Sequence, residues 1–112
     1  MFVLLNKSNL KSKKYSAIFY NSETEKKIKT VNFGAKEMGD YLIYSTDSKE
    51  VADLRKSLYI KRNQKRQSEL WDNNPMSPAA LSRWLLWNKD TMKDSVDDYI
   101  KRFDTIDKVI IN

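Results

Sequence analysis

The chain has 112 residues, a length that suits one domain with a hydrophobic core of its own. It contains no Cys and no His, which excludes disulfides, thiolate metal sites, cysteine nucleophiles and the commonest general base. Its formal net charge is +6, a balance that favours phosphate-rich or acidic partners.

The N-terminal part of the chain predicts β-strands. The short apolar run Phe2–Asn6 is typical of a buried strand. Tyr15–Tyr20 and Lys27–Phe33 alternate between two faces and are joined by the polar turn Asn21–Thr24, a pattern that predicts a β-hairpin. After a glycine break, Tyr41–Tyr44 predicts a further strand or a partly buried connection.

A first helix is predicted to start near the acidic pair Asp47 and Glu50, whose charge suits the positive end of a helix. Its apolar residues fall at helical spacing, and we expect them to pack on the core: Val51, Leu54 and Leu58. Between residues 61 and 69 there is no apolar side chain. We therefore expect a helix that is anchored in its first half and bare in its second.

Two more helices and a closing strand are predicted downstream. Ser77 and Pro78 form a favourable helix start ahead of the largely apolar run Ala79–Trp87, which should be the central buried helix. Thr91 is the expected cap of a third helix, with an amphipathic stripe of Met92, Val96, Tyr99, Ile100 and Phe103. Lys108–Ile111 reads as a strand that could pair with the N-terminal one.

These elements predict an α+β fold, in which a small antiparallel sheet of three to five strands is packed by three helices. We expect one domain over residues 1–112, with mainly strands in 1–46, helices in 47–107 and the closing strand in 108–112. The apolar start of the chain is too short for a signal peptide or a membrane helix, so no membrane contact is expected.

The strongest candidate site is a basic face on the first helix, where six cations and no acid occur in twelve residues: Arg55, Lys56, Lys61, Arg62, Lys65 and Arg66. At about 100° per residue, Arg55, Arg62 and Arg66 share one stripe with Tyr59. Arginine forks suit phosphate oxygens, and a tyrosine can stack on an unpaired base. Two alternatives stay open: a solvated face, and pairing of these cations with acids of the C-terminal part. For Tyr59, a position at the rim of the core is favoured over a stacking platform.

Three smaller features have a functional and a structural interpretation. Among the tryptophans, Trp84 and Trp87 fit the core, whereas Trp71 is a possible anchor for a partner. A loop cluster of Lys7, Lys11, Lys13 and Lys14 is either a second basic contact or a solvated loop. The acids Asp94, Asp97, Asp98, Asp104 and Asp107 fit a solvated helix face better than a cation site.

One segment, Tyr59–Phe103, resembles a family of small proteins encoded by nucleocytoplasmic large DNA viruses of the mimivirus and phycodnavirus kind. The similar residues are Trp71, Asn74, Pro75, Leu81, Ser82, Arg83, Trp84, Leu86, Trp87, Asn88, Tyr99, Arg102 and Phe103, together with Val31–Gly34 upstream. In that family a His often stands near the position of Arg62, where this chain has Asn63. The resemblance implies a viral source and no particular activity. It also suggests that Arg83–Asn88 is a buried helix closed by its own Asn.

We therefore expect a non-catalytic viral protein that binds nucleic acid through the phosphate backbone, in genome packaging or organisation. The expected contacts are Arg55, Lys56, Tyr59, Lys61, Arg62, Lys65 and Arg66, and neither a cofactor nor a metal is expected. The alternative is a structural or adaptor protein of the virion or the infected cell that binds an acidic protein surface. A reducing location, host cytoplasm or virion, fits the absence of Cys.

Overall fold

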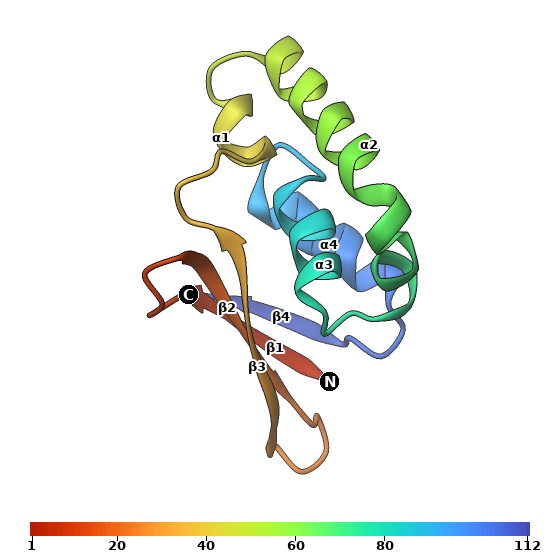
Figure 1. Cartoon of the computed structure of the whole chain (residues 1–112). Helices are drawn as coiled ribbons and strands as arrows, with labels where there is room; N and C mark the ends of the chain where they lie inside the picture. Colours follow the sequence, from red (N-terminus) through yellow and green to blue (C-terminus); the bar gives the residue numbers. More distant parts are fainter.

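The computed structural model describes residues 1–112 and places helices against a four-stranded sheet (Figure 1). The strands lie in the order β3-β2-β1-β4 and comprise β1 (Phe2–Lys7), β2 (Lys13–Tyr20), β3 (Lys27–Ala35) and β4 (Lys108–Ile111). The predicted hairpin is confirmed, because β2 pairs antiparallel with both β1 and β3. The α+β class is confirmed as well.

The two ends of the chain meet in the sheet, as the sequence predicted. β4 pairs with β1, with Val109 opposite Val3, and the backbone N–H of Asn112 donates to the Leu5 carbonyl at 2.9 Å. This pairing is parallel, so the sheet is mixed rather than antiparallel. The reason is geometric: α4 lies between Trp87 and β4 and returns the chain to the end of the sheet where β1 begins.

The alternation of apolar residues in the strands makes one face of the sheet the floor of the core. The buried strand residues are Val3, Leu5, Ala17, Phe19, Val31 and Phe33. They pack against α3 (Pro78–Leu81), the π-helical turn η1 (Ser82–Leu86) and α4 (Met92–Arg102). The long helix α2 (Lys49–Asn73) lies outside this layer and contacts α1 (Tyr41–Ser45) and α3 (Figure 1).

Capping side chains start the helices, mostly where the sequence placed them. The Ser77 hydroxyl accepts from the N–H of Ala80 at 3.0 Å, and the Thr91 hydroxyl accepts from that of Asp94 at 3.2 Å. Both helix starts were predicted. α2 begins one residue later than expected, because Ser48 rather than Asp47 is its N-cap. The capping hydroxyl satisfies a backbone N–H that has no partner inside the helix.

Of the two interpretations of Tyr41–Tyr44, a strand or a partly buried connection, the strand is wrong, because these residues form the helix α1. Asp40 precedes them in an extended conformation, and its carboxylate accepts from the N–H of Ile43 at 3.0 Å. A four-residue apolar run carries no periodicity that separates strand from helix. Here the acidic cap decides the outcome.

The predicted packing face of α2 is also wrong. Val51, Leu54 and Leu58 are exposed, and Leu54 retains 60% of its accessible surface. The helix turns a different stripe inward, in which Ala52 and Trp71 are buried and Tyr59 and Ile60 lie against the core. Tyr59 and Trp71 add their ring stacking to the apolar area that they bury, which favours this stripe.

The predicted central helix is present but changes character along its length. Pro78–Leu81 is α-helical, and a π-helical turn follows, in which the N–H of Trp87 reaches the Ser82 carbonyl at 3.1 Å. Its end is closed as the resemblance suggested: Asn88 is buried and donates to the Trp84 carbonyl at 3.1 Å. Trp84 is buried too, and its indole N–H donates to the Trp71 carbonyl at 2.7 Å. This confirms the core interpretation of Trp84.

Candidate functional site

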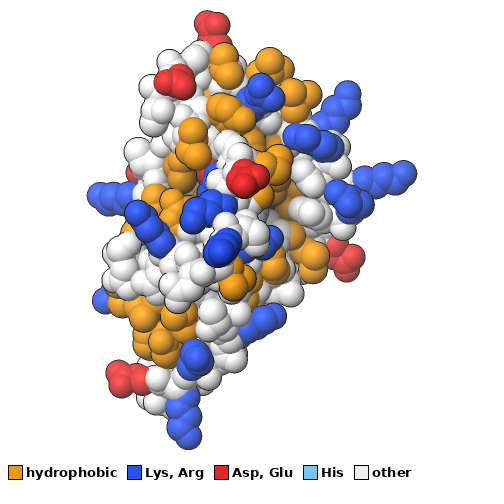
Figure 2. All heavy atoms as spheres, turned by 60° about the vertical axis from the view of Figure 1, so that its left-hand side comes forward, with side chains coloured by type: hydrophobic (Ala, Val, Ile, Leu, Met, Phe, Trp, Pro, Cys, Tyr) orange, Lys and Arg blue, Asp and Glu red, His pale blue; other side chains and the backbone are white.

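The outer position of α2 leaves most of its cations in solvent. Five of the predicted contacts are exposed and form what we call the basic face: Arg55, Lys61, Arg62, Lys65 and Arg66. Figure 2 shows the side of the molecule that carries α1, where Lys and Arg side chains stand clear of the surface and outnumber the acidic ones. A helix that packs through one narrow stripe keeps the rest of its circumference accessible.

No acidic side chain neutralises the basic face. The four ion pairs of the chain join Met1 to Asp107, Lys14 to Asp40, Lys49 to Asp90 and Arg102 to Asp98. None of them involves residues 55–66. The alternative in which acids of the C-terminal part cover these cations is therefore wrong, because Asp98 pairs within its own helix, and Asp94 and Asp97 pair with none of them.

Lys56 was predicted to be a phosphate contact, but it is committed to the fold. Its ammonium group donates to the Asn88 carbonyl at 2.8 Å and lies 4.4 Å from the ring centre of Tyr41. Burial, with the nearby Arg83 cation, lowers its pKa. A phosphate would have to compete with these contacts, so Lys56 is removed from the candidate site.

Tyr59 and Trp71 are not available as exposed aromatic platforms either. The ring of Tyr59 stacks on Trp87 at 4.6 Å between centroids and on Trp71 at 6.1 Å. Trp71 itself is only 5% exposed, so the predicted partner anchor is wrong. The core-rim interpretation holds for Tyr59, and burial raises the pKa of its phenol to about 12. It is therefore neutral at physiological pH.

Three aliphatic side chains lie beside the cations on the solvent side of α2. This apolar ridge consists of Val51, Leu54 and Leu58, all exposed. Ile43 of α1 is exposed as well. Figure 2 shows apolar and basic side chains interleaved over the side of the molecule that carries α1. The surface is therefore cationic with apolar patches rather than purely charged.

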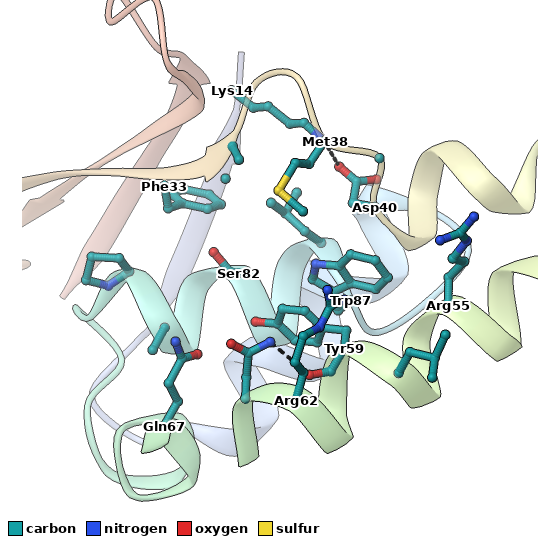
Figure 3. Close-up of a pocket in the computed structure, with 18 of the residues that line it drawn as sticks. Lys14, Phe33, Met38, Asp40, Arg55, Tyr59, Arg62, Gln67, Ser82 and Trp87 are labelled. Atoms are coloured by element: carbon teal, nitrogen blue, oxygen red, sulfur yellow. Dashed lines mark hydrogen bonds and ion pairs between the residues drawn. The ribbon is translucent and has the colours of Figure 1, made fainter. Parts of the chain in front are cut away.

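A cleft opens on the other flank of α2, between this helix, the end of β3 and η1. Its volume is about 440 Å³, within the range of small-ligand sites. Figure 3 shows Tyr59 and Arg62 reaching it from α2, Lys14 and Met38 from the opposite side, and Ser82 and Trp87 from the helical layer. Arg55, which also lines the cleft, stands beyond Trp87 next to α1. The cleft thus joins the basic face to the interior of the molecule, and we call it the α2 cleft.

Aromatic rings form one wall of the α2 cleft. Trp87 is half-buried, lies parallel to Tyr59 within 6°, and has the tilted ring of Tyr44 at 6.3 Å. The Arg55 guanidinium lies 5.4 Å from the Tyr44 ring centre, which tethers this cation at the mouth of the cleft. The predicted core position of Trp87 is therefore only partly correct, because the ring also lines the cleft.

The acid in the cleft is neutralised. Asp40 lines the wall beside Lys14, whose ammonium group is 2.6 Å from its carboxylate. Both side chains are largely buried, with 12% of Lys14 and 4% of Asp40 exposed. Arg55 and Arg62 also line the cleft and have no acidic partner. The cleft therefore presents net positive charge to a ligand.

Unused polar groups face the same space. Figure 3 shows the hydroxyl of Ser82 directed into the cleft, and the indole nitrogen of Trp87 on the side that faces Ser82. The Gln67 amide lines the cleft nearby. None of these three groups has a hydrogen-bond partner within the chain. They supply one indole donor, one hydroxyl and one amide, which can serve both donors and acceptors of a ligand.

The remaining sequence candidates separate in the structure. Lys7 and Lys11 are exposed, whereas Lys13 is half-buried and Lys14 is held by Asp40, so the N-terminal lysines do not act as one cluster. No three acidic side chains converge as they would around a metal ion. No helix combines the length and the apolar character that crossing a bilayer demands.

Sequence reasoning identified the basic face but missed the α2 cleft. The sequence marked several of its wall residues one by one, namely the cations of α2, the lysines of the N-terminal loop and Trp87, but it did not bring them together. Lys14, Asp40 and Ser82 come from three distant segments, and no spacing pattern links them. Asp40 ahead of Tyr41 is typical of a helix cap rather than of a site, and the sequence analysis did not use this signal.

Comparison with known proteins gives a family and no function. Residues 3–63 match the model of a family described as "Family of unknown function (DUF5754)". No curated protein and no solved structure matches the chain. The matched region spans β1 to the middle of α2, so most of Tyr59–Phe103 lies outside it. The resemblance to proteins of large DNA viruses rests on that segment and stays a prediction.

Proposed function

The chain belongs to the DUF5754 family of unknown function, and from the geometry of α2 we propose that the protein is a non-catalytic nucleic-acid-binding protein. The phosphate backbone would lie along the basic face. If the likeness to large DNA viruses holds, the nucleic acid would be a viral genome during packaging or organisation. The protein would then act in the host cytoplasm or the virion.

One observation carries this proposal: five cations of a single helix are exposed, and none has an acidic partner. Exposed cations that repel one another gain most from an external polyanion. Arg62 and Arg66 lie one helical turn apart, about 6 Å along the axis, so both can reach one strand. Their planar forks bind phosphate oxygens in pairs.

Binding of this kind would be largely independent of sequence. Contacts to phosphates position a protein on nucleic acid but do not distinguish bases. Each neutralised phosphate releases counterions, so the affinity falls steeply as salt rises. For five contacts on duplex DNA, the expected loss between 50 and 200 mM salt is about two to three orders of magnitude.

The proposal is tested by reversing charge at two sites with the same change in net charge. Arg62→Glu with Arg66→Glu alters the basic face, whereas Lys27→Glu with Lys29→Glu alters exposed lysines of β3. Fluorescence anisotropy with a labelled duplex and a labelled single strand gives the affinity at several salt concentrations. We expect the α2 variant to bind about tenfold or more weakly than the parent. The slope of log affinity against log salt concentration should also become shallower by about 2.

The β3 variant is the control for net charge. It should bind within about threefold of the parent, because long-range charge contributes less than direct contact. Equal losses in the two variants would show that net charge alone drives binding and would reject the basic face as the contact. Circular dichroism and thermal melting establish that both variants are folded.

The apolar ridge favours a second candidate, an adaptor that binds an acidic protein surface in the virion or the infected cell. Exposed aliphatic side chains beside cations are typical of protein interfaces rather than of phosphate contacts. Competition by polyglutamate of matched charge separates the two candidates. If polyglutamate displaces nucleic acid at equal charge concentration, the adaptor interpretation is favoured. If it competes only in large excess, the nucleic-acid proposal stands.

A further inference from the structure

We propose that the α2 cleft binds one nucleotide unit, with its base against Trp87 and its phosphate between Arg55 and Arg62. This inference deepens the proposed function and rests on it where the phosphate is concerned, since two of the same arginines would hold it. The inference goes further than phosphate contact, because it requires one base of the bound nucleic acid to unstack from its neighbours and enter the α2 cleft.

The size and shape of the cleft fit a flat ring with a charged substituent. A volume of about 440 Å³ accommodates a small ligand but not a helix or a duplex. Arg55 and Arg62 both line the cleft from α2 (Figure 3). We therefore expect a ligand to place its anionic end beside these arginines and its neutral end against Trp87.

Trp87 provides a supported stacking surface. Its indole lies flat on Tyr59 at 4.6 Å, so the ring is held in position before any ligand arrives. In Figure 3 the thioether of Met38 reaches into the cleft from the wall opposite α2. A base that stacks on Trp87 would have Met38 available as a second apolar contact, an arrangement that suits any base because each has a π-face.

Charge and hydrogen bonding are complementary to the same ligand. The two arginines at the mouth are free of acids, and the only carboxylate of the cleft is neutralised by Lys14. Ser82, Gln67 and the indole N–H of Trp87 can meet the polar edge of a base. An aromatic ligand without an anionic group would leave the guanidinium groups of Arg55 and Arg62 without a partner. A nucleotide has both a base and a phosphate, so it matches both parts of the cleft.

The α2 cleft can bind only a nucleotide whose base is not already paired and stacked. Bases of an intact duplex are paired and stacked, so they cannot reach the cleft without being flipped. Both a single strand and a free mononucleotide present an unstacked base. The shared chemistry is therefore a nucleoside monophosphate unit, and the experiment has one arm for each source.

The first arm compares two single strands with equal numbers of phosphates, one with all its bases and one abasic. Stacking of one base on an aromatic ring is worth enough that the normal strand should bind on the order of tenfold more tightly. Ser82→Leu fills the cleft without touching the arginines. It should remove this tenfold preference and leave the salt dependence unchanged.

The matched control is Ser57→Leu, at an exposed position of α2 outside the cleft. It should retain the preference for bases. Trp87→Leu is a second cleft variant, which removes the stacking surface and should also abolish the preference. Since Trp87 supports Tyr59, this variant could lose stability, and Ser82→Leu keeps the test decisive in that case.

The second arm adds adenosine 5′-monophosphate and follows the indole N–H resonance of Trp87, assigned with Trp87→Leu. Adenosine and ribose 5-phosphate are controls for the phosphate and the base. A shift of this resonance with the mononucleotide, absent in Ser82→Leu, supports the cleft as a nucleotide site. Such a shift without binding of either strand identifies a free nucleotide as the ligand and rejects the proposed function alone.

Two outcomes overturn the inference. If abasic and normal strands bind equally and the mononucleotide leaves Trp87 unshifted, the cleft takes no nucleotide, although the phosphate contact of the basic face survives. If neither strand nor the mononucleotide binds at low salt, both the inference and the proposed function fail.

Discussion

The ion pair of Lys14 with Asp40 offers the sharpest test of how the walls of the α2 cleft are held. It joins β2 to the residue that caps α1, at 2.6 Å between ammonium nitrogen and carboxylate oxygen. The other oxygen of Asp40 accepts the N–H of Ile43 at 3.0 Å. We predict that Lys14→Met destabilises the fold, because it leaves a carboxylate that is 4% exposed with one hydrogen bond and no counter-charge.

The expected magnitude follows from burial. Removing one partner of a buried pair costs about 3–5 kcal/mol, and the low end applies here because Lys14 keeps 12% of its surface in water. For a domain of this size, about 3 kcal/mol lowers the melting temperature by about 12 °C. Thermal melting and urea unfolding measure both quantities.

The double variant Lys14→Met with Asp40→Asn is the control. An Asn oxygen can still accept from Ile43, and no unpaired charge remains, so we expect stability within about 1 kcal/mol of the parent. A single variant that loses less than about 1 kcal/mol, or a double variant no more stable than the single one, would refute this reasoning.

Further predictions concern packing and pH. Burial alone would raise the pKa of Asp98, but hydrogen bonds from Arg102 and Asn88 hold it below its ordinary value. This carboxylate therefore stabilises the fold at neutral pH, and its contribution is lost progressively as the pH falls from about 4 through the lowered pKa of the folded state. In urea titrations the unfolding free energies of the parent and Asp98→Asn should approach each other over that range. Tyr99→Phe should lower the free energy of unfolding by about 1–2 kcal/mol, because it removes the hydroxyl that donates to the Pro75 carbonyl at 2.7 Å. An unchanged midpoint of urea unfolding would contradict this. Gly34→Ala should lower the free energy of unfolding by about 2 kcal/mol or more, because φ is 79° at this residue and an added Cβ would lie 2.7 Å from the Leu86 side chain. A melting temperature equal to that of the parent would contradict this prediction.

The sequence predicted the fold correctly where the apolar side chains of a segment, read from their spacing, are also the ones that the structure buries. The strands alternate regularly, so both their existence and the face they bury could be predicted. Thr91 and Ser77 are strong caps, and both helices start where these residues placed them. The meeting of the two ends in the sheet was predicted from their apolar composition, but the parallel direction of β4 depends on the path of α4.

α2 shows why the rest could not be predicted. Its sequence contains two competing stripes, one aliphatic at the start and one that includes Tyr59 and Trp71. Periodicity marks both, and only the partner surface decides which is buried. The aromatic stripe prevails because Tyr59 stacks on Trp87 from a distant segment. The apolar ridge and the α2 cleft are consequences of that choice, so neither was visible before the fold was known.

The central claim is that the cations of α2 are free to neutralise phosphates. It is tested most directly by the salt dependence of binding to a single strand, measured from about 50 to 200 mM. Five contacts predict a log–log slope of about −3.5, and three predict about −2. A slope near zero, or no binding at the lowest salt, would contradict the account.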